Sequence, residues 1–178
     1  PGAPNYAGGS LHALATTSNV GVPGRFIYRL DTAVRGAGDA GCNDLIVGGD
    51  FASVGGAAAG GVARYNCDAD AWEPLGEGFN GPVHAVRAYR GRIYAGGAFT
   101  ASATAGTPLP YFAVWDGQAW APVDGVGLTG TVYALEVYHG LLYVGGFYNA
   151  TLPSAVPNEW VSAMNLVAWD GRHWQYGA

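Results

Sequence analysis

The sequence contains no lysine, and its eight basic residues, all arginine, do not gather in any cluster. Proteins that bind nucleic acids carry a basic patch or stripe, so we expect no nucleic-acid partner. Charged residues make up only 12% of the 178 residues, roughly half their share in an average soluble domain. No apolar run approaches the roughly 18 residues of a membrane span, which predicts that this segment does not insert into a membrane.

Glycine and aromatic residues are abundant where charge is scarce. The chain has 30 glycines, and aromatic residues supply 13% of it. Polar low-complexity sequence, which would indicate a disordered chain, does not replace the missing charge. Many glycines together with many aromatic residues are typical of a turn-rich all-β protein.

An internal repeat of about 50 residues organises the sequence. A double glycine closes a short apolar run three times, with spacings of 48 and 49 residues, at Gly48-Gly49, Gly96-Gly97 and Gly145-Gly146. A tryptophan follows each pair, at Trp72, Trp120 and Trp174. A similar apolar block opens each repeat, at Leu11–Leu14, Val83–Val86 and Val132–Leu135. We therefore divide the chain into an N-terminal segment, 1–7, and three units, 8–79, 80–128 and 129–178.

The sequence pattern of each unit predicts four short strands. The first strand begins at the opening apolar block, the second ends at the double glycine, and the fourth carries the tryptophan. Tight turns at Gly91 and Gly140 join the first two strands. Between the third and fourth strands we expect turns at Asp116 and Asp170, whose side chains cap the chain. The second strand is apolar on both faces, which indicates small sheets stacked face to face, with the paired glycines allowing close approach.

The repeat resembles kelch-type β-propeller repeats. The resemblance is carried by Leu142–Tyr148, by the Trp-Asp-Gly sequences at 115–117 and 169–171, and by Trp72–Gly76. It is closest to repeats of secreted and cell-surface proteins such as the fungal cortical polarity-marker family. It implies an all-β β-propeller fold with three four-stranded blades, part of a larger or assembled propeller. It also implies an extracellular, often glycosylated, interaction surface.

Unit 1 is longer than the others, because about 24 extra residues separate its first two strands. This insertion, at about 19–43, includes Phe26–Leu30, a candidate extra strand. Cys42 lies at its end, and Cys67 lies just after the third strand. Neighbouring antiparallel strands would bring the two cysteines together, so we expect a disulfide and an oxidising compartment. Two unrelated buried thiols are the alternative.

The segment between the second and third strands of unit 3, Asn149–Asn165, is predicted to be a loop rich in apolar residues. Such residues on a loop indicate a partner contact, or else they pack on the protein's own edge. The candidate contact residues are Leu152, Val156, Trp160 and Met164. The same segment holds the one N-glycosylation sequon, which predicts a glycan on Asn149 in a secreted eukaryotic protein.

Signals for catalysis and metal binding are weak. The sequence has no nucleophile elbow and no zinc-ligand spacing. His12 and His84 occupy one repeat position, which indicates a structural role. Asn66, Asp68 and Asp70 alternate as in a calcium loop but lack its glycine and distant glutamate, so a solvated hairpin turn is the alternative. We expect no cofactor.

These observations favour a non-enzymatic extracellular structural or adhesion module that presents a propeller surface for protein–protein assembly. A carbohydrate-binding, lectin-like propeller is the first alternative, with glycans as partners, and a fragment of a galactose-oxidase-like enzyme is the second. Closed propellers have about four to eight blades, so three blades do not easily close alone. We therefore expect a piece of a longer protein, an assembly with copies of itself or other chains, or an open array.

Overall fold

The computed structural model describes residues 27–33, 44–66, 69–153 and 159–175. Within these ranges the chain is all-β, as predicted, and contains no helix. No helix able to cross a bilayer therefore occurs in the part of the chain that the structure describes.

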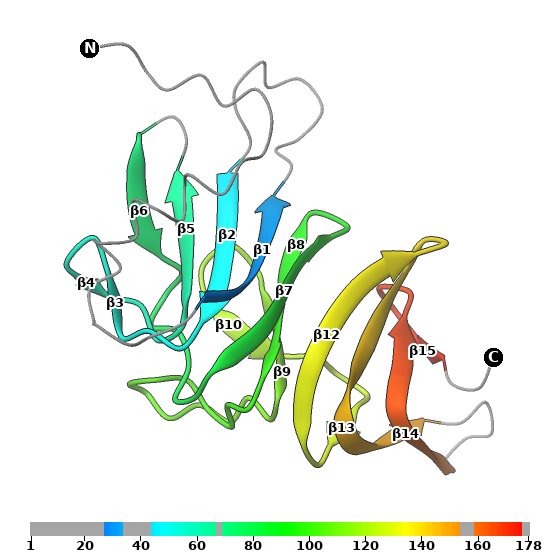
Figure 1. Ribbon diagram of the computed structural model, residues 1–178. Helices are drawn as coiled ribbons and strands as arrows, with labels where there is room; N and C mark the ends of the chain where they lie inside the picture. The colour runs from blue at the N-terminus through cyan, green and yellow to red at the C-terminus, as the bar shows by residue number, and fades with distance from the viewer. Residues whose placement is uncertain (1–26, 34–43, 67–68, 154–158, 176–178) are drawn as a thin grey trace.

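Three antiparallel sheets contain most of the strands, and the four main strands of each sheet follow chain order (Figure 1). The first sheet consists of β1 (Ile27–Ala33), β2 (Asp44–Gly49), β5 (Val62–Asn66) and β6 (Ala71–Pro74). The second consists of β7 (Val83–Tyr89), β8 (Arg92–Gly97), β9 (Phe112–Trp115) and β10 (Trp120–Pro122). The third consists of β12 (Thr131–Tyr138), β13 (Leu141–Pro153), β14 (Trp160–Trp169) and β15 (Trp174–Gln175).

Three short strands lie outside this scheme. β11 (Gly127–Leu128) pairs with the far half of β13 and becomes a fifth strand of the third sheet. β3 (Ser53–Val54) and β4 (Ala57–Ala58) pair with each other as a small hairpin in the connection between β2 and β5.

The first strand of the first sheet lies inside the predicted insertion, 19–43. β1 pairs antiparallel with β2, as β7 pairs with β8 and β12 with β13. The segment around Phe26–Leu30 thus supplies the strand beside β2 rather than an addition to the sheet. The block Leu11–Leu14, predicted as this strand, lies outside the described residues.

The prediction that Asn149–Asn165 of unit 3 forms a loop is wrong. Most of this segment is a β-hairpin. β13 does not end at Gly145-Gly146 but continues to Pro153, and β14 begins at Trp160. The side chains of this last part of β13 alternate between a buried and an exposed face, which is the pattern of a half-buried strand. The buried positions in β13 are Ala150 and Leu152, with Val161 and Ala163 packed against them from β14.

Two tight turns are as predicted. Arg90 and Gly91 join β7 to β8 with φ angles of 50° and 73°. His139 and Gly140 join β12 to β13 with φ angles of 48° and 77°. Two successive residues with positive φ are the requirement of a type I′ hairpin turn, whose twist matches that of the flanking strands.

The turns at Asp116 and Asp170 also confirm the prediction. Asp116 Oδ1 accepts hydrogen bonds from the backbone N–H groups of residues 118 and 119, both at 2.8 Å. Asp170 Oδ1 accepts the equivalent pair from residues 172 and 173, both at 2.7 Å. The glycine after each aspartate has positive φ, 109° at Gly117 and 96° at Gly171. Each carboxylate therefore satisfies two backbone donors that the turn leaves unpaired.

These bonds predict an acid-sensitive stabilisation. The backbone N–H donors of the two turns hold the pKa of the Asp116 and Asp170 carboxyls below the ordinary value of an aspartate. A carboxyl with a lowered folded-state pKa contributes stability that is present above its unfolded pKa and is lost as the pH falls through the folded value. We expect both carboxyl carbons to titrate below pH 3.8, the ordinary Asp value, in an NMR titration. Midpoints at or above that value would contradict the capping role.

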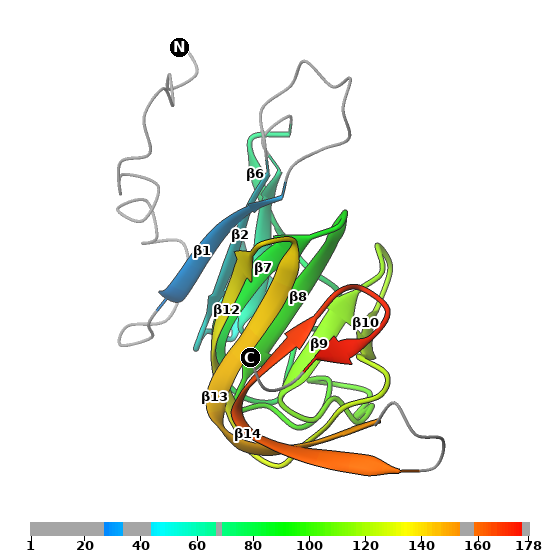
Figure 2. The ribbon, with the colours of Figure 1, turned by 90° about the vertical axis from the view of Figure 1, so that its right-hand side faces the viewer.

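The three sheets stack face to face and do not close on themselves (Figures 1 and 2). β7 packs against β1 and β2, and β12 packs against β7 and β8. Two continuous apolar clusters fill the spaces between the sheets, one between the first and second and one between the second and third. A third, smaller cluster, which includes Val47 and Phe51, lies on the outer side of the first sheet.

Candidate interaction surface

The first glycine of each pair lies at one repeat position, paired with a residue of the third main strand. Gly48 pairs with Val62, Gly96 with Phe112, and Gly145 with Leu166. A Cβ atom placed on Gly48 would lie 2.9 Å from Cγ1 of both Val83 and Val86 in the next sheet. One placed on Gly96 would lie 2.9 Å from Cβ of Val132 and closer still to its Cγ1. These glycines are therefore required because the next sheet packs directly onto them.

The second glycine of each pair has a different role. A Cβ on Gly97 would lie 3.0 Å from Cα of Val83, within the same sheet. One on Gly146 would overlap the backbone oxygen of Thr131, across the same sheet. The predicted close approach of backbones is thus found inside the second and third sheets, whereas between sheets a valine side chain meets the first glycine.

Two of the repeated tryptophans, in the second and third sheets, connect their sheet to the one before it. Trp120 Nε1 donates to the carbonyl of Leu75, which follows the last strand of the first sheet, at 2.8 Å. Trp174 Nε1 donates to the carbonyl of Asp124, which follows the last strand of the second sheet, also at 2.8 Å. A buried indole requires such an acceptor, so these bonds fix the spacing of neighbouring sheets.

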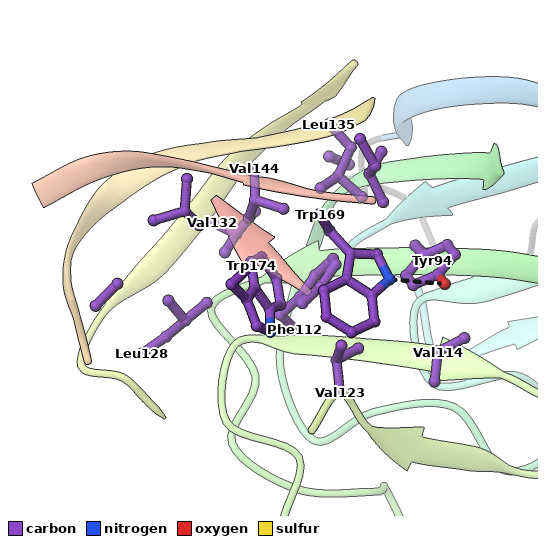
Figure 3. Close-up of a cluster of buried hydrophobic side chains, with 14 of the residues drawn as sticks. Tyr94, Phe112, Val114, Val123, Leu128, Val132, Leu135, Val144, Trp169 and Trp174 are labelled. Atoms are coloured by element: carbon purple, nitrogen blue, oxygen red, sulfur yellow. Dashed lines mark hydrogen bonds between the residues drawn. The ribbon is translucent and has the colours of Figure 1, made fainter. Parts of the chain in front are cut away.

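The interface between the second and third sheets shows what a covered sheet face contains (Figure 3). Tyr94 and Phe112 from the second sheet pack against Trp174 and Trp169 of the third, and Trp169 Nε1 donates to the Tyr94 hydroxyl at 3.3 Å. The Tyr89 hydroxyl donates to the carbonyl of Gly140 at 2.6 Å. The covered face is thus largely apolar, and its polar atoms find partners in the next sheet.

The corresponding face of the third sheet is uncovered in the described structure. By strand register, Tyr138, Tyr143, Gly145 and Leu166 take the places of Tyr89, Tyr94, Gly96 and Phe112. Tyr89 is 6% exposed and Phe112 is 2% exposed, whereas Tyr138 is 62% exposed and Leu166 is 55% exposed. We call Tyr138, Tyr143, Gly145 and Leu166 the open face.

Gly145 shows most directly that no described residue of another sheet packs on the open face. A Cβ placed there would approach no described atom more closely than 3.8 Å, and its nearest neighbours are Ala134 and Leu166 of its own sheet. A glycine in a strand weakens the strand unless close packing requires it. At the same position Gly48 and Gly96 are required by the next sheet, so Gly145 is the glycine for which the structure shows no such requirement.

The predicted contact residues of unit 3 have separate fates. Leu152 is fully buried in the core and is therefore not a surface contact, which corrects that prediction. Val156 lies outside the described residues. Trp160 and Met164 are largely exposed on the outer face of the β13–β14 hairpin. Their role as contacts stays a prediction.

The predicted glycosylation residue lies on that same outer face. Asn149 is exposed and pairs directly with Met164 across the hairpin. Directly opposed residues on one face of an antiparallel pair are neighbours, with Cβ atoms about 5 Å apart. A glycan on Asn149 would therefore lie beside Met164, whereas Trp160 pairs with Pro153 at the other end of the hairpin.

The remaining predicted site residues give no assembled site. Cys42, Cys67 and Asp68 lie outside the described residues, so the predicted disulfide stays a prediction. Asn66 Oδ1 accepts from the backbone N–H of Ala69 at 3.2 Å, and its Nδ2 donates to Glu73 at 2.9 Å. Asp70 accepts a hydrogen bond from the hydroxyl of Tyr65.

Asn66 and Asp70, the described members of the calcium candidate, are thus bonded within their own hairpin. Among the described residues, no three His, Cys, Asp or Glu side chains gather closely enough to hold a metal ion.

Comparison with known proteins gives no relative. No family model, curated protein or solved structure matches this chain. The open face is therefore the strongest candidate for a functional surface, and it is one that sequence reasoning did not select. The sequence did contain a signal for this surface. Aligning the three repeats places Tyr138 and Leu166 at the positions of Tyr89 and Phe112, which lie in the interface between the second and third sheets.

Proposed function

We propose that this chain is a non-enzymatic extracellular structural or adhesion module, built from propeller-type repeats, that assembles with protein partners through the open face. The uncovered surface at Tyr138, Tyr143, Gly145 and Leu166 carries this proposal, because the same positions are covered in the second sheet and, where described, in the first. Monomeric proteins rarely leave a contiguous apolar face open to solvent. The extracellular placement is supported by the sequence positions of the two cysteines, which predict a disulfide, and by the exposed sequon at Asn149.

The chemistry of the open face fits assembly better than catalysis. It combines two tyrosines and a leucine with a glycine that lets another backbone approach. Aromatic residues are enriched in the cores of protein interfaces, where charged residues are depleted. A sheet with the character of the second or third sheet is the natural partner, since those sheets cover the corresponding faces inside this chain.

The test compares two exposed apolar residues on β14 in this 178-residue chain. Leu166→Glu places a charge in the open face, and Met164→Glu places the same charge on the outer face of the hairpin. We expect light scattering to show that the chain is assembled and that Leu166→Glu reduces its mass to 18.3 kDa. Met164→Glu should leave the assembled mass unchanged.

Two results would count against the proposal. An unaltered chain that is monomeric at every concentration tested would remove the need for a partner on this face. An assembly that Met164→Glu disrupts and Leu166→Glu does not would move the contact to the outer face of the hairpin.

A further inference from the structure

We propose that the open face receives the first sheet of a second copy of this chain, so that copies stack head to tail. This proposal rests on the proposed assembly function and names its partner. Inside the chain each covered face meets the sheet that follows, and only the first sheet has no described sheet in front of it. The first sheet of another copy is therefore the sheet available to continue the stack.

The outer side of the first sheet carries the residues that such a contact needs. In the second and third sheets, one row of three paired residues across the second, third and fourth strands faces the preceding sheet. These rows are Ile93, Trp115 and Trp120, and Leu142, Trp169 and Trp174. The first sheet has an equivalent row, which we call the outer row: Leu45, Tyr65 and Trp72.

The outer row matches its counterparts in chemistry as well as position. It holds an aliphatic residue, an aromatic residue and a tryptophan in the same order, and all three side chains are half-buried. Tyr65 and Trp72 make an edge-to-face contact with ring centroids 5.3 Å apart. An ordered aromatic surface of this kind is what the open face would meet if it were covered as the second sheet is.

Trp72 has an indole N–H for which the described residues supply no acceptor. At the same repeat position, Trp120 and Trp174 each donate to a carbonyl just beyond the preceding sheet. Trp72 is half-buried against the cluster that includes Val47 and Phe51, and no described sheet lies before it. The end of the third sheet in a second copy would bring carbonyls to this donor.

The register of β1 supports the same arrangement. Val83 and Val132, whose side chains reach the glycines of the preceding sheets, pair with Gly97 and Gly146 in their own sheets. Ile27 pairs with Gly49 and so holds the same register position in the first sheet. Head-to-tail stacking would place the register position of Ile27 in one copy next to Gly145 of the other copy.

The number of sheets favours a closed pair of copies. Head-to-tail contacts are heterologous and produce rings when the rotation closes. Three stacked sheets do not close here, whereas two copies would supply six, within the roughly four to eight of closed propellers. We therefore expect a dimer with twice the 18.3 kDa mass of one chain.

The experiment uses one variant at each end and a mixture of the two. Leu166→Glu blocks the open face, and Trp72→Glu blocks the outer row. Each variant alone should be a monomer by light scattering, with its dimer weakened at least about tenfold. The mixture should regain dimer mass through one junction, because the intact outer row of one variant can meet the intact open face of the other, while the second junction of the pair carries both changes. Circular dichroism checks that each variant folds, and Leu45→Glu replaces Trp72→Glu if that variant does not.

The outcomes separate this inference from the proposed function. If Leu166→Glu is monomeric while Trp72→Glu remains a dimer, two open faces pair with each other. The assembly function then stands and head-to-tail stacking is overturned. If the unaltered chain is monomeric, both are overturned. Masses above the dimer that both variants abolish would retain head-to-tail stacking and overturn the closed pair.

Discussion

Replacing Trp120 with alanine should lower the free energy of unfolding by about 3–5 kcal/mol, the usual cost of removing a large buried aromatic side chain. Trp120 is 7% exposed, packs against Phe79 with ring centroids 4.7 Å apart, and donates its indole N–H to Leu75. Alanine would leave a cavity between the first and second sheets and an unpaired carbonyl beside it. Urea unfolding followed by circular dichroism measures this loss.

Trp72 is the matched control, because it holds the same repeat position but is only half-buried, against the small cluster on the outer side of the first sheet. Trp72→Ala should cost about 1–2 kcal/mol when measured on the monomer. Equal losses at the two positions would mean that the tryptophan stabilises its own sheet rather than the contact with the preceding sheet. The interpretation of the repeat as a series of sheet-to-sheet connections would then be wrong.

Replacing Gly96 with valine should cost about 3 kcal/mol, at the upper end of the range for overpacking a core. Even the Cβ atom would overlap Val132, which belongs to a backbone segment held by pairing with β13. The third sheet would have to move away from the second or lose its side-chain order. The measurement is again urea unfolding, made in the monomeric Leu166→Glu background so that assembly does not contribute.

Gly145→Val is the counterpart at the same repeat position. In that background we expect a change within about 0.5 kcal/mol, because a Cβ there has no neighbour closer than 3.8 Å and β-branched residues favour strands. A large loss of stability at Gly145 would show that the open face is covered within a single chain. Without the Leu166→Glu change, Gly145→Val should weaken the dimer.

The repeat predicted the strands that follow its motifs and missed those that do not. The double glycines and tryptophans located β2, β8, β10 and β15. The Asp-Gly turns located the end of β9 and of β14 and the start of the strand that follows each. The hairpin after Asn149 was missed because the repeat pattern ends the second strand at the double glycine, which makes the residues up to the third strand a connection. The alternation of polar and apolar residues over Asn149–Leu152 was the better signal in the sequence. Pro153 is tolerated because it lies at the end of β13.

The candidate surface was harder to predict than the strands. Gly96 and Gly145 are the same residue in the same motif, and they differ only in what lies above them in space. The exposure of the first glycine of a pair depends on whether another sheet follows. No motif within a single unit indicates this. Leu152 illustrates the opposite error, since an apolar residue in a predicted loop proved to be part of the core.

The contiguity of each sheet in the chain has a consequence for how this architecture can vary. In the described residues the main contacts between sheets join sheets that are neighbours in the chain, so the stack behaves as a one-dimensional array with nearest-neighbour coupling. Its cohesion is set by a single kind of junction, a glycine-bearing side against a tryptophan-bearing side. Gain or loss of one repeat then changes the length of the array without requiring a new junction.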